Sequence, residues 1–96
     1  MSTAYLLLVV RYRVLISGRV QGVFFRDSCR RLAVQHDVGG WVRNLPDGRV
    51  EAVFEGFADD VGCLVDWAHH GPRLAVVEAV AVQPEPPEGL RTFQIR

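Results

Sequence analysis

Residues 11–36 read RYRVLISGRVQGVFFRDSCRRLAVQH, and this stretch decides the fold because its hydrophobic period changes within it. Polar and apolar side chains alternate over residues 11–17, which predicts a strand. Two glycines four residues apart interrupt the alternation over residues 18–23 and indicate a tightly turning loop. Apolar side chains return at helical spacing over residues 25–36 and predict an amphipathic helix. A strand, a glycine loop and a helix are therefore expected to follow one another directly.

The segment after this helix predicts a β-hairpin. Gly39-Gly40 is expected to end the helix, and residues 41–45 and 49–55 are two short strand-like runs. The sequence Pro46-Asp47-Gly48 separates them, and Asp-Gly between such runs is a strong hairpin signal. We expect the two strands to pair antiparallel.

The last third of the chain predicts a second helix and two more strands. The helix is expected to begin at Asp59-Asp60 and to stop at Gly71-Pro72, with an apolar stripe between them. Residues 75–82 are rich in valine and predict a strand, while residues 90–95 alternate and predict a short final one. The prolines in residues 84–88 exclude a central strand there.

This order of elements is that of the ferredoxin-like split βαβ sandwich, an α+β fold with βαββαβ topology plus, here, a short final strand. It implies an antiparallel sheet with both helices on one face and solvent on the other. We expect one domain over residues 1–96, in which residues 1–10 form an N-terminal extension of undefined role. The fold alone does not decide function, since it hosts enzymes, metal carriers and RNA-binding modules.

Composition excludes several classes of partner. The 11 Lys plus Arg residues balance the 11 Asp plus Glu residues, so no overall field favours nucleic acid or an anionic membrane. Every one of these cations is Arg, the side chain that offers paired donors to a phosphate. Any anion site is therefore expected to be local.

Nothing in the sequence indicates a metal site or an export signal. Cys29 and Cys63 lack partners at ligand spacing, which favours reduced, buried thiols. His36 and His69-His70 lie at predicted helix ends. This position favours an interaction with the helix C-terminal dipole over a role in metal binding. The apolar run over residues 5–10 is too short to cross a bilayer, and we expect a cytoplasmic location.

The glycine loop is the first candidate for a functional site. A loop that follows a strand and opens a helix points backbone N–H groups and the helix dipole at one place, which suits an anion. The loop over residues 18–26 lacks the Gly-Lys-Ser/Thr ending of a Walker A motif. Spacing alone leaves both an anion site and an ordinary loop open.

Two segments, in order, resemble the motifs of the acylphosphatase family. Residues 18–26 match its signature as GxVQGVxFR, and residues 40–51 resemble its second motif as GWVRNxxDGxVE. Trp67 and Gly71-Pro72 also match, so the similarity runs from about Val14 to the C-terminus. Arg73 stands where the family usually has a second proline, which we expect to affect loop geometry rather than activity.

The resemblance implies metal-independent and cofactor-independent hydrolysis of carboxyl-phosphate bonds, as in acetyl phosphate, carbamoyl phosphate or 1,3-bisphosphoglycerate (EC 3.6.1.7). Carried over by position, Arg26 binds the phosphate and Asn44 orients the attacking water. The residues whose backbone would cradle the phosphate are Val20, Gln21, Gly22, Val23, Phe24 and Phe25. A small acyl phosphate is then the partner, and we expect a monomer.

Each of these residues also has a simpler interpretation. Outside the motif, Arg26 would be a solvated helix residue and Asn44 a turn residue. Solvated surface positions are expected for Arg19, Arg30, Arg43, Glu51, Glu55, Asp59 and Asp60. Trp41, Phe54 and Trp67 are expected to pack in the core or at an edge, and Phe24 to lie exposed at the mouth of the site.

Two other functions fit the same fold. An RNA-binding module would stack bases on strand aromatics, but the chain has no basic face and no aromatic RNA-binding signature. A carbamoyl-phosphate-handling domain of a larger maturation enzyme would normally accompany zinc-finger-like cysteines. We expect a free-standing enzyme instead.

Overall fold

A computed structural model describes residues 8–96 of the chain and gives the predicted order of elements. The five strands and two helices are β1 (Val9–Arg19), α2 (Phe25–Gln35), β2 (Gly39–Asn44), β3 (Val50–Phe57), α3 (Ala58–Ala68), β4 (Val76–Glu85) and β5 (Phe93–Ile95). Of the N-terminal extension, residues 1–7 lie outside the described part, while Val9 and Val10 belong to β1. The ferredoxin-like α+β fold is confirmed.

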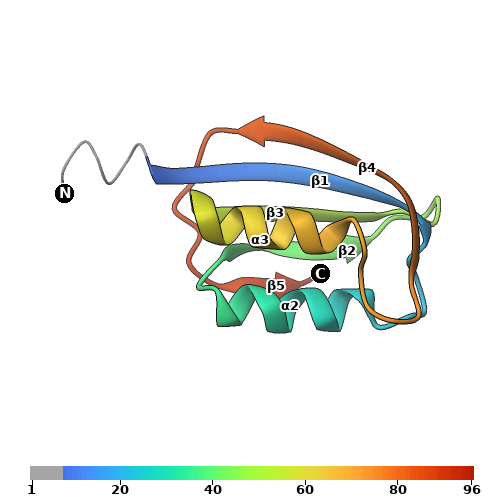
Figure 1. The fold of residues 1–96 in the computed structure, drawn as a ribbon. Helices are drawn as coiled ribbons and strands as arrows, with labels where there is room; N and C mark the ends of the chain where they lie inside the picture. The colour runs from blue at the N-terminus through green and yellow to red at the C-terminus, as the bar shows by residue number, and fades with distance from the viewer. Residues whose placement is uncertain (1–7) are drawn as a thin grey trace.

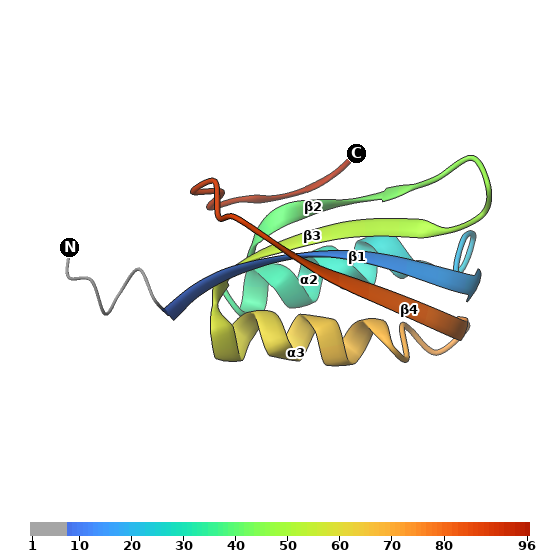
Figure 2. The same cartoon turned by 90° about the horizontal axis from the view of Figure 1, so that it is seen from above.

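The sheet has the strand order β4-β1-β3-β2-β5, and both helices cover the same face of it (Figures 1 and 2). The strands β1, β2, β3 and β4 pair antiparallel with their neighbours, as predicted. The short strand β5 instead pairs in parallel with β2. The reason is the path of the chain. Strand β4 ends at the end of the sheet where β2 begins, so the chain crosses there and β5 returns in the direction of β2.

The core lies between the sheet and the helices. Even-numbered residues of β1, β2 and β3 face the helices, as Val14, Val42 and Phe54 do. The Phe25 ring of α2 lies 5.0 Å from the Trp67 ring of α3, which joins the two helices. Strand β4 lies at the edge of the sheet and contains Pro84, which has no backbone N–H. Proline is tolerated there because an edge strand pairs on one side only.

The other face of the sheet carries a network of ion pairs, which corrects the expectation that Glu51 and Glu55 are ordinary surface charges. Glu55 is only 2% exposed because the segment after β4 folds over it. Its carboxylate accepts backbone N–H bonds from residues 88, 89 and 90 at 2.9, 2.6 and 2.8 Å. The Arg11 guanidinium donates to it at 3.3 Å.

Glu51 is the second centre of this network. It accepts from Arg13 at 2.8 Å and from Arg43 at 2.7 Å, so Arg43 is ion-paired rather than simply solvated as expected. The guanidinium carbons of Arg13, Arg43 and Arg96 lie 5.6, 5.3 and 4.9 Å from the ring centre of Trp41. Trp41 is therefore covered and only 7% exposed.

Two further expectations are corrected. Cys29 is buried as predicted, and burial raises the pKa of its thiol, but Cys63 is exposed because it lies on the side of α3 away from Val61 and Leu64. The first helix ends at Gln35, ahead of the expected Gly39-Gly40, which instead begin β2. In residues 8–96 no helix has the length and apolar character needed to span a bilayer.

Removing the Glu55 carboxylate tests how much the outer network contributes to the fold. We expect Glu55→Ala to lower the free energy of unfolding by about 2 to 4 kcal/mol, because charged hydrogen bonds to three backbone N–H groups and a buried Arg11 are lost. The matched control is Glu88→Ala, since Glu88 lies 3.5 Å from the same guanidinium but is 64% exposed. We expect a change below about 1 kcal/mol there, and equal effects in urea denaturation would contradict the assignment.

The network also sets how stability depends on pH. Burial raises the pKa of Glu55, but the hydrogen bonds from the backbone N–H groups and Arg11 outweigh this effect, so that its pKa lies below its usual value. The contribution of Glu55 to the free energy of unfolding is therefore complete above its unfolded-state pKa of about 4.3. It is lost as the pH falls through its folded-state pKa. We expect a urea midpoint that is flat from about pH 7 to 5.5 and falls below about pH 4.5. Glu55→Gln should fall less steeply, and an unchanged acid slope would refute this.

Candidate active site

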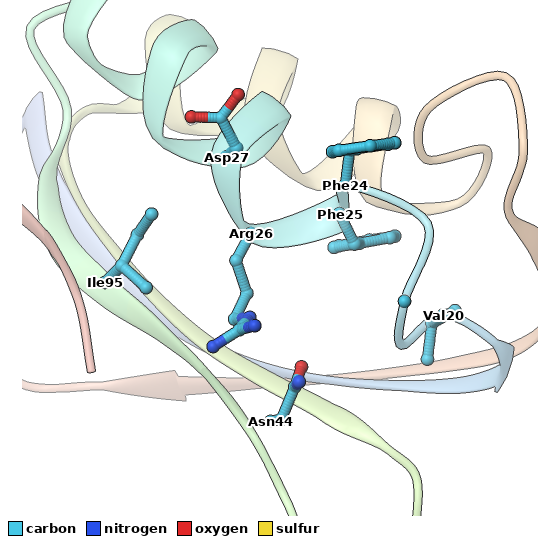
Figure 3. A pocket seen from close by; sticks show the side chains of 8 residues that line it. Val20, Phe24, Phe25, Arg26, Asp27, Asn44 and Ile95 are labelled. Atoms are coloured by element: carbon cyan, nitrogen blue, oxygen red, sulfur yellow. The ribbon is translucent and has the colours of Figure 1, made fainter.

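The loop between β1 and α2, the end of β2 and the end of β5 line one open cavity of about 360 Å³ (Figure 3). Its lining residues are Val20, Gly22, Phe24, Phe25, Arg26, Asp27, Asn44 and Ile95. Six of these eight residues are among the eight that the sequence singled out for the site. The two motifs, far apart in sequence, therefore meet in space.

Two predicted loop residues do not line this cavity. Val23 is buried in the core at 4% exposure, and the Gln21 side chain points to the β2–β3 hairpin. Two lining residues were missed by sequence reasoning. Asp27 follows Arg26 directly and carries no motif, and Ile95 reaches the cavity only because β5 pairs with β2.

The loop backbone adopts a shape that suits an anion. Gly22 and Phe24 both have positive φ, 72° and 65° respectively. For a bulky residue such as Phe24 this conformation costs about 1 to 2 kcal/mol, and the ring itself is 71% exposed, so packing does not explain it. Within residues 8–96, the backbone N–H groups of Gly22, Val23 and Phe24 donate no hydrogen bond. These donors and the N-terminus of α2 are available to a ligand.

Asn44 is the last residue of β2 and lies opposite Val50 of β3. This register places it on the helix-facing side of the sheet, and Figure 3 shows its side chain pointing toward the Arg26 guanidinium. Its Oδ1 atom is buried and is the one buried side-chain polar atom without a hydrogen-bond partner in the described part of the chain. An unsatisfied buried acceptor costs about 1 to 3 kcal/mol, which favours a bound donor at this place.

Arg26 lies in the first turn of α2 and is half-buried. Its guanidinium has no ion-pair or hydrogen-bond partner among residues 8–96. The neighbouring Asp27 pairs with Arg31 at 3.0 Å, and Figure 3 shows the Asp27 carboxylate turned away from Asn44. The other arginine side chains without such a partner are exposed: Arg19, Arg30, Arg73, Arg91 and Arg96. The half-buried charge of Arg26 is thus available to bind a ligand.

The loop and the β2–β3 hairpin are joined by one side chain. Gln21 Nε2 donates to the carbonyl oxygen of Leu45 at 2.8 Å and to that of Arg49 at 3.0 Å. Leu45 is the residue after Asn44. The side chain therefore connects the two parts of the cavity wall.

This arrangement can hold a small oxyanion. A forked cation and converging backbone donors suit a tetrahedral group with negative oxygens, and a buried amide oxygen beside them can accept from a water molecule. No group of three or more His, Cys, Asp or Glu side chains in the described residues is arranged to bind a metal ion. The class of protein that the fold and cavity define is a small α+β protein with a cavity at the start of its first helix whose hydrogen-bond donors suit an oxyanion.

Comparison with known proteins gives the family. Residues 12–95 match the sequence pattern of the acylphosphatase family. The chain is 62% identical over 87 residues to an acylphosphatase from Rubrobacter xylanophilus, covering 90% of this chain and 79% of that one. It is 57% identical over 88 residues to an acylphosphatase from Nostoc sp., covering 92% and 87%. The chain belongs to the acylphosphatase family, the hydrolases of class EC 3.6.1.7.

A solved structure agrees with this assignment. The structure of an acylphosphatase from Coxiella burnetii superposes on this chain with a TM-score of 0.92 at 37% identity. The superposition covers 99% of this chain and 100% of the other. The ordering of strands and helices described above is therefore the family fold.

Substituting the loop glycine tests whether the cavity is an oxyanion site. At both Gly22 and Gly48 the φ angle is positive and an added Cβ meets nothing within 4 Å, so Gly22→Ala and Gly48→Ala should each cost about 1 to 2 kcal/mol of stability. We expect only Gly22→Ala to weaken binding of inorganic phosphate, by about tenfold or more, because its methyl group faces the cavity. Phosphate titration by NMR measures this, and equal affinities would contradict it.

Proposed function

We propose that this chain hydrolyses the carboxyl-phosphate bond of small acyl phosphates to a carboxylate and inorganic phosphate without a metal ion. The observation that carries this proposal is a pair of unsatisfied groups at one cavity. They are the half-buried, unpaired Arg26 guanidinium and the buried, unpartnered Asn44 oxygen, both described within residues 8–96. The names of the relatives support the same reaction class.

In this proposal Arg26 and the loop hold the phosphate. The guanidinium offers two parallel donors, and the backbone N–H groups from Val20 to Phe25 supply further donors at the start of α2. Hydrogen bonds to a charged group are worth about 1.5 to 3 kcal/mol each. Such donors also stabilise the charge that spreads over the phosphoryl oxygens in the transition state.

Asn44 orients the water. Its amide oxygen accepts a hydrogen bond and is too weak a base to take the proton, so its role is direction. The water oxygen bonds to phosphorus as the bond from phosphorus to the acyl oxygen breaks. The electron pair leaves with the carboxylate, and the water proton passes to a phosphate oxygen of the substrate. A carboxylate is a good leaving group at pH 7, so no general acid is required.

We also propose a cytoplasmic monomer. One chain supplies every described residue that lines the cavity, so a second copy is not needed to complete it. The two cysteines are free thiols, which suits a reducing compartment. The rival RNA-binding function is less well supported, because Trp41 on the open sheet face is covered by arginines rather than free to stack on a base.

The test is release of inorganic phosphate from acetyl or benzoyl phosphate with chelator present. We expect Arg26→Ala and Asn44→Ala each to lower kcat/KM by about 10²- to 10³-fold, as loss of one transition-state donor or positioning group does. Arg26→Lys should also be severely impaired, because the ammonium keeps the charge but loses the forked geometry.

The matched control is Arg30→Ala, which removes the same charge from an exposed site one turn further along α2. We expect it to retain activity within about twofold, with all variants folded by circular dichroism. Absence of turnover in the native chain, or loss of turnover on adding chelator, would overturn the proposal.

A further inference from the structure

The Gln21 side chain makes contacts that the reaction proposed above does not use. Its Nε2 donates to two carbonyl oxygens, Leu45 O at 2.8 Å and Arg49 O at 3.0 Å. Gln21 immediately precedes Gly22 of the loop, and Leu45 immediately follows Asn44. One half-buried amide group therefore bridges the oxyanion loop, residues 20–25 between β1 and the start of α2, and the residue next to the proposed water-orienting side chain.

These contacts are not needed to close the hairpin itself. Leu45 N–H already donates to Arg49 O at 2.8 Å across the two strands. Within the turn, Asp47 accepts from the Arg49 backbone at 3.1 Å and from its side chain at 2.9 Å. Gln21 is the one residue of the segment 20–25 whose side chain can form hydrogen bonds, since the others are valine, glycine and phenylalanine. Gln21 therefore joins the loop to a hairpin that is closed without it.

We propose that Gln21 is a positioning residue that fixes the distance and angle between the oxyanion loop with Arg26 and the side chain of Asn44. This inference rests on the proposed function. In-line attack requires the water and the phosphorus to be held in one geometry, and a displacement of about 1 Å can cost about 10²-fold in rate. Gln21 holds that geometry through Leu45, which is covalently linked to Asn44.

The first test replaces Gln21 by an apolar side chain of similar length. We expect Gln21→Met to lower kcat by about 10- to 100-fold, while the inhibition constant of inorganic phosphate changes less than about threefold. Phosphate affinity should change little because the groups that hold the phosphate, Arg26 and the loop N–H groups, belong to the start of α2 and do not depend on the hairpin. Gln35→Met, in an exposed glutamine at the end of α2, is the matched control and should leave kcat unchanged. An unchanged kcat in Gln21→Met, or an equal loss of phosphate affinity, would overturn the proposal.

A double-mutant cycle separates positioning from a general loss of structure. If Gln21 acts through Asn44, Gln21→Met should reduce kcat little further when introduced into Asn44→Ala. Fully additive losses would overturn the positioning role. If Asn44→Ala alone retained native activity, the proposed function would fail instead, so the two failures are distinguishable.

A second variant covers the case in which Gln21→Met does not fold. Gln21→Glu keeps the shape, but its ionised form cannot donate to Leu45 O or Arg49 O, whereas its protonated form can donate one bond. We expect its kcat relative to the native enzyme to rise as pH falls from 7 toward about 4.5, as the carboxyl group protonates. A ratio that does not change with pH would contradict the proposal.

Discussion

The register of β2 on β3 is the constraint on which the site depends. Asn44 lies opposite Val50, which puts its side chain on the helix-facing side of the sheet with Val42. A slip of one residue would turn Asn44 to the opposite face, because side chains alternate along a strand. Gly40 opposes such a slip: a Cβ there would lie 1.8 Å from the Val53 carbonyl oxygen, so this close approach fits glycine alone. The same register brings the end of β2 beside the start of α2, as Figure 3 shows for Asn44 and Arg26.

The two faces of the sheet differ in how their arginine charges are neutralised. On the outer face, the arginines that are near Glu51 and Glu55 are matched by carboxylates, and the network stabilises the fold while adding little net field. On the helix side, Arg26 is half-buried and has no such partner in the described residues. A chain of zero formal net charge thus has, among its described residues, a half-buried unpaired cation beside a cavity, and this suits a small anion better than a polyanion.

The sequence predicts the element order, because the periods of residues 11–36 and the Asp47-Gly48 turn are strong local signals. The motifs also indicate six of the eight residues that line the cavity. Alternation shows which face Glu55 occupies but not what covers it, since the covering residues 88–90 follow a different strand. The place of Ile95 depends on the parallel pairing of β5, which follows from where β4 ends. The motif likewise marks Gln21 but not the direction of its side chain, which only the folded hairpin defines.

In the proposed mechanism, water held beside Asn44 attacks the phosphorus atom of a substrate whose phosphate lies on Arg26 and the loop. The most direct measurement is hydrolysis of benzoyl phosphate in water enriched with oxygen-18, followed by mass analysis of both products under single-turnover conditions. Attack at phosphorus places the label in inorganic phosphate and none in benzoate, and this is the result we expect. Label in the benzoate would mean attack at the acyl carbon, and would contradict the geometry assigned to the site.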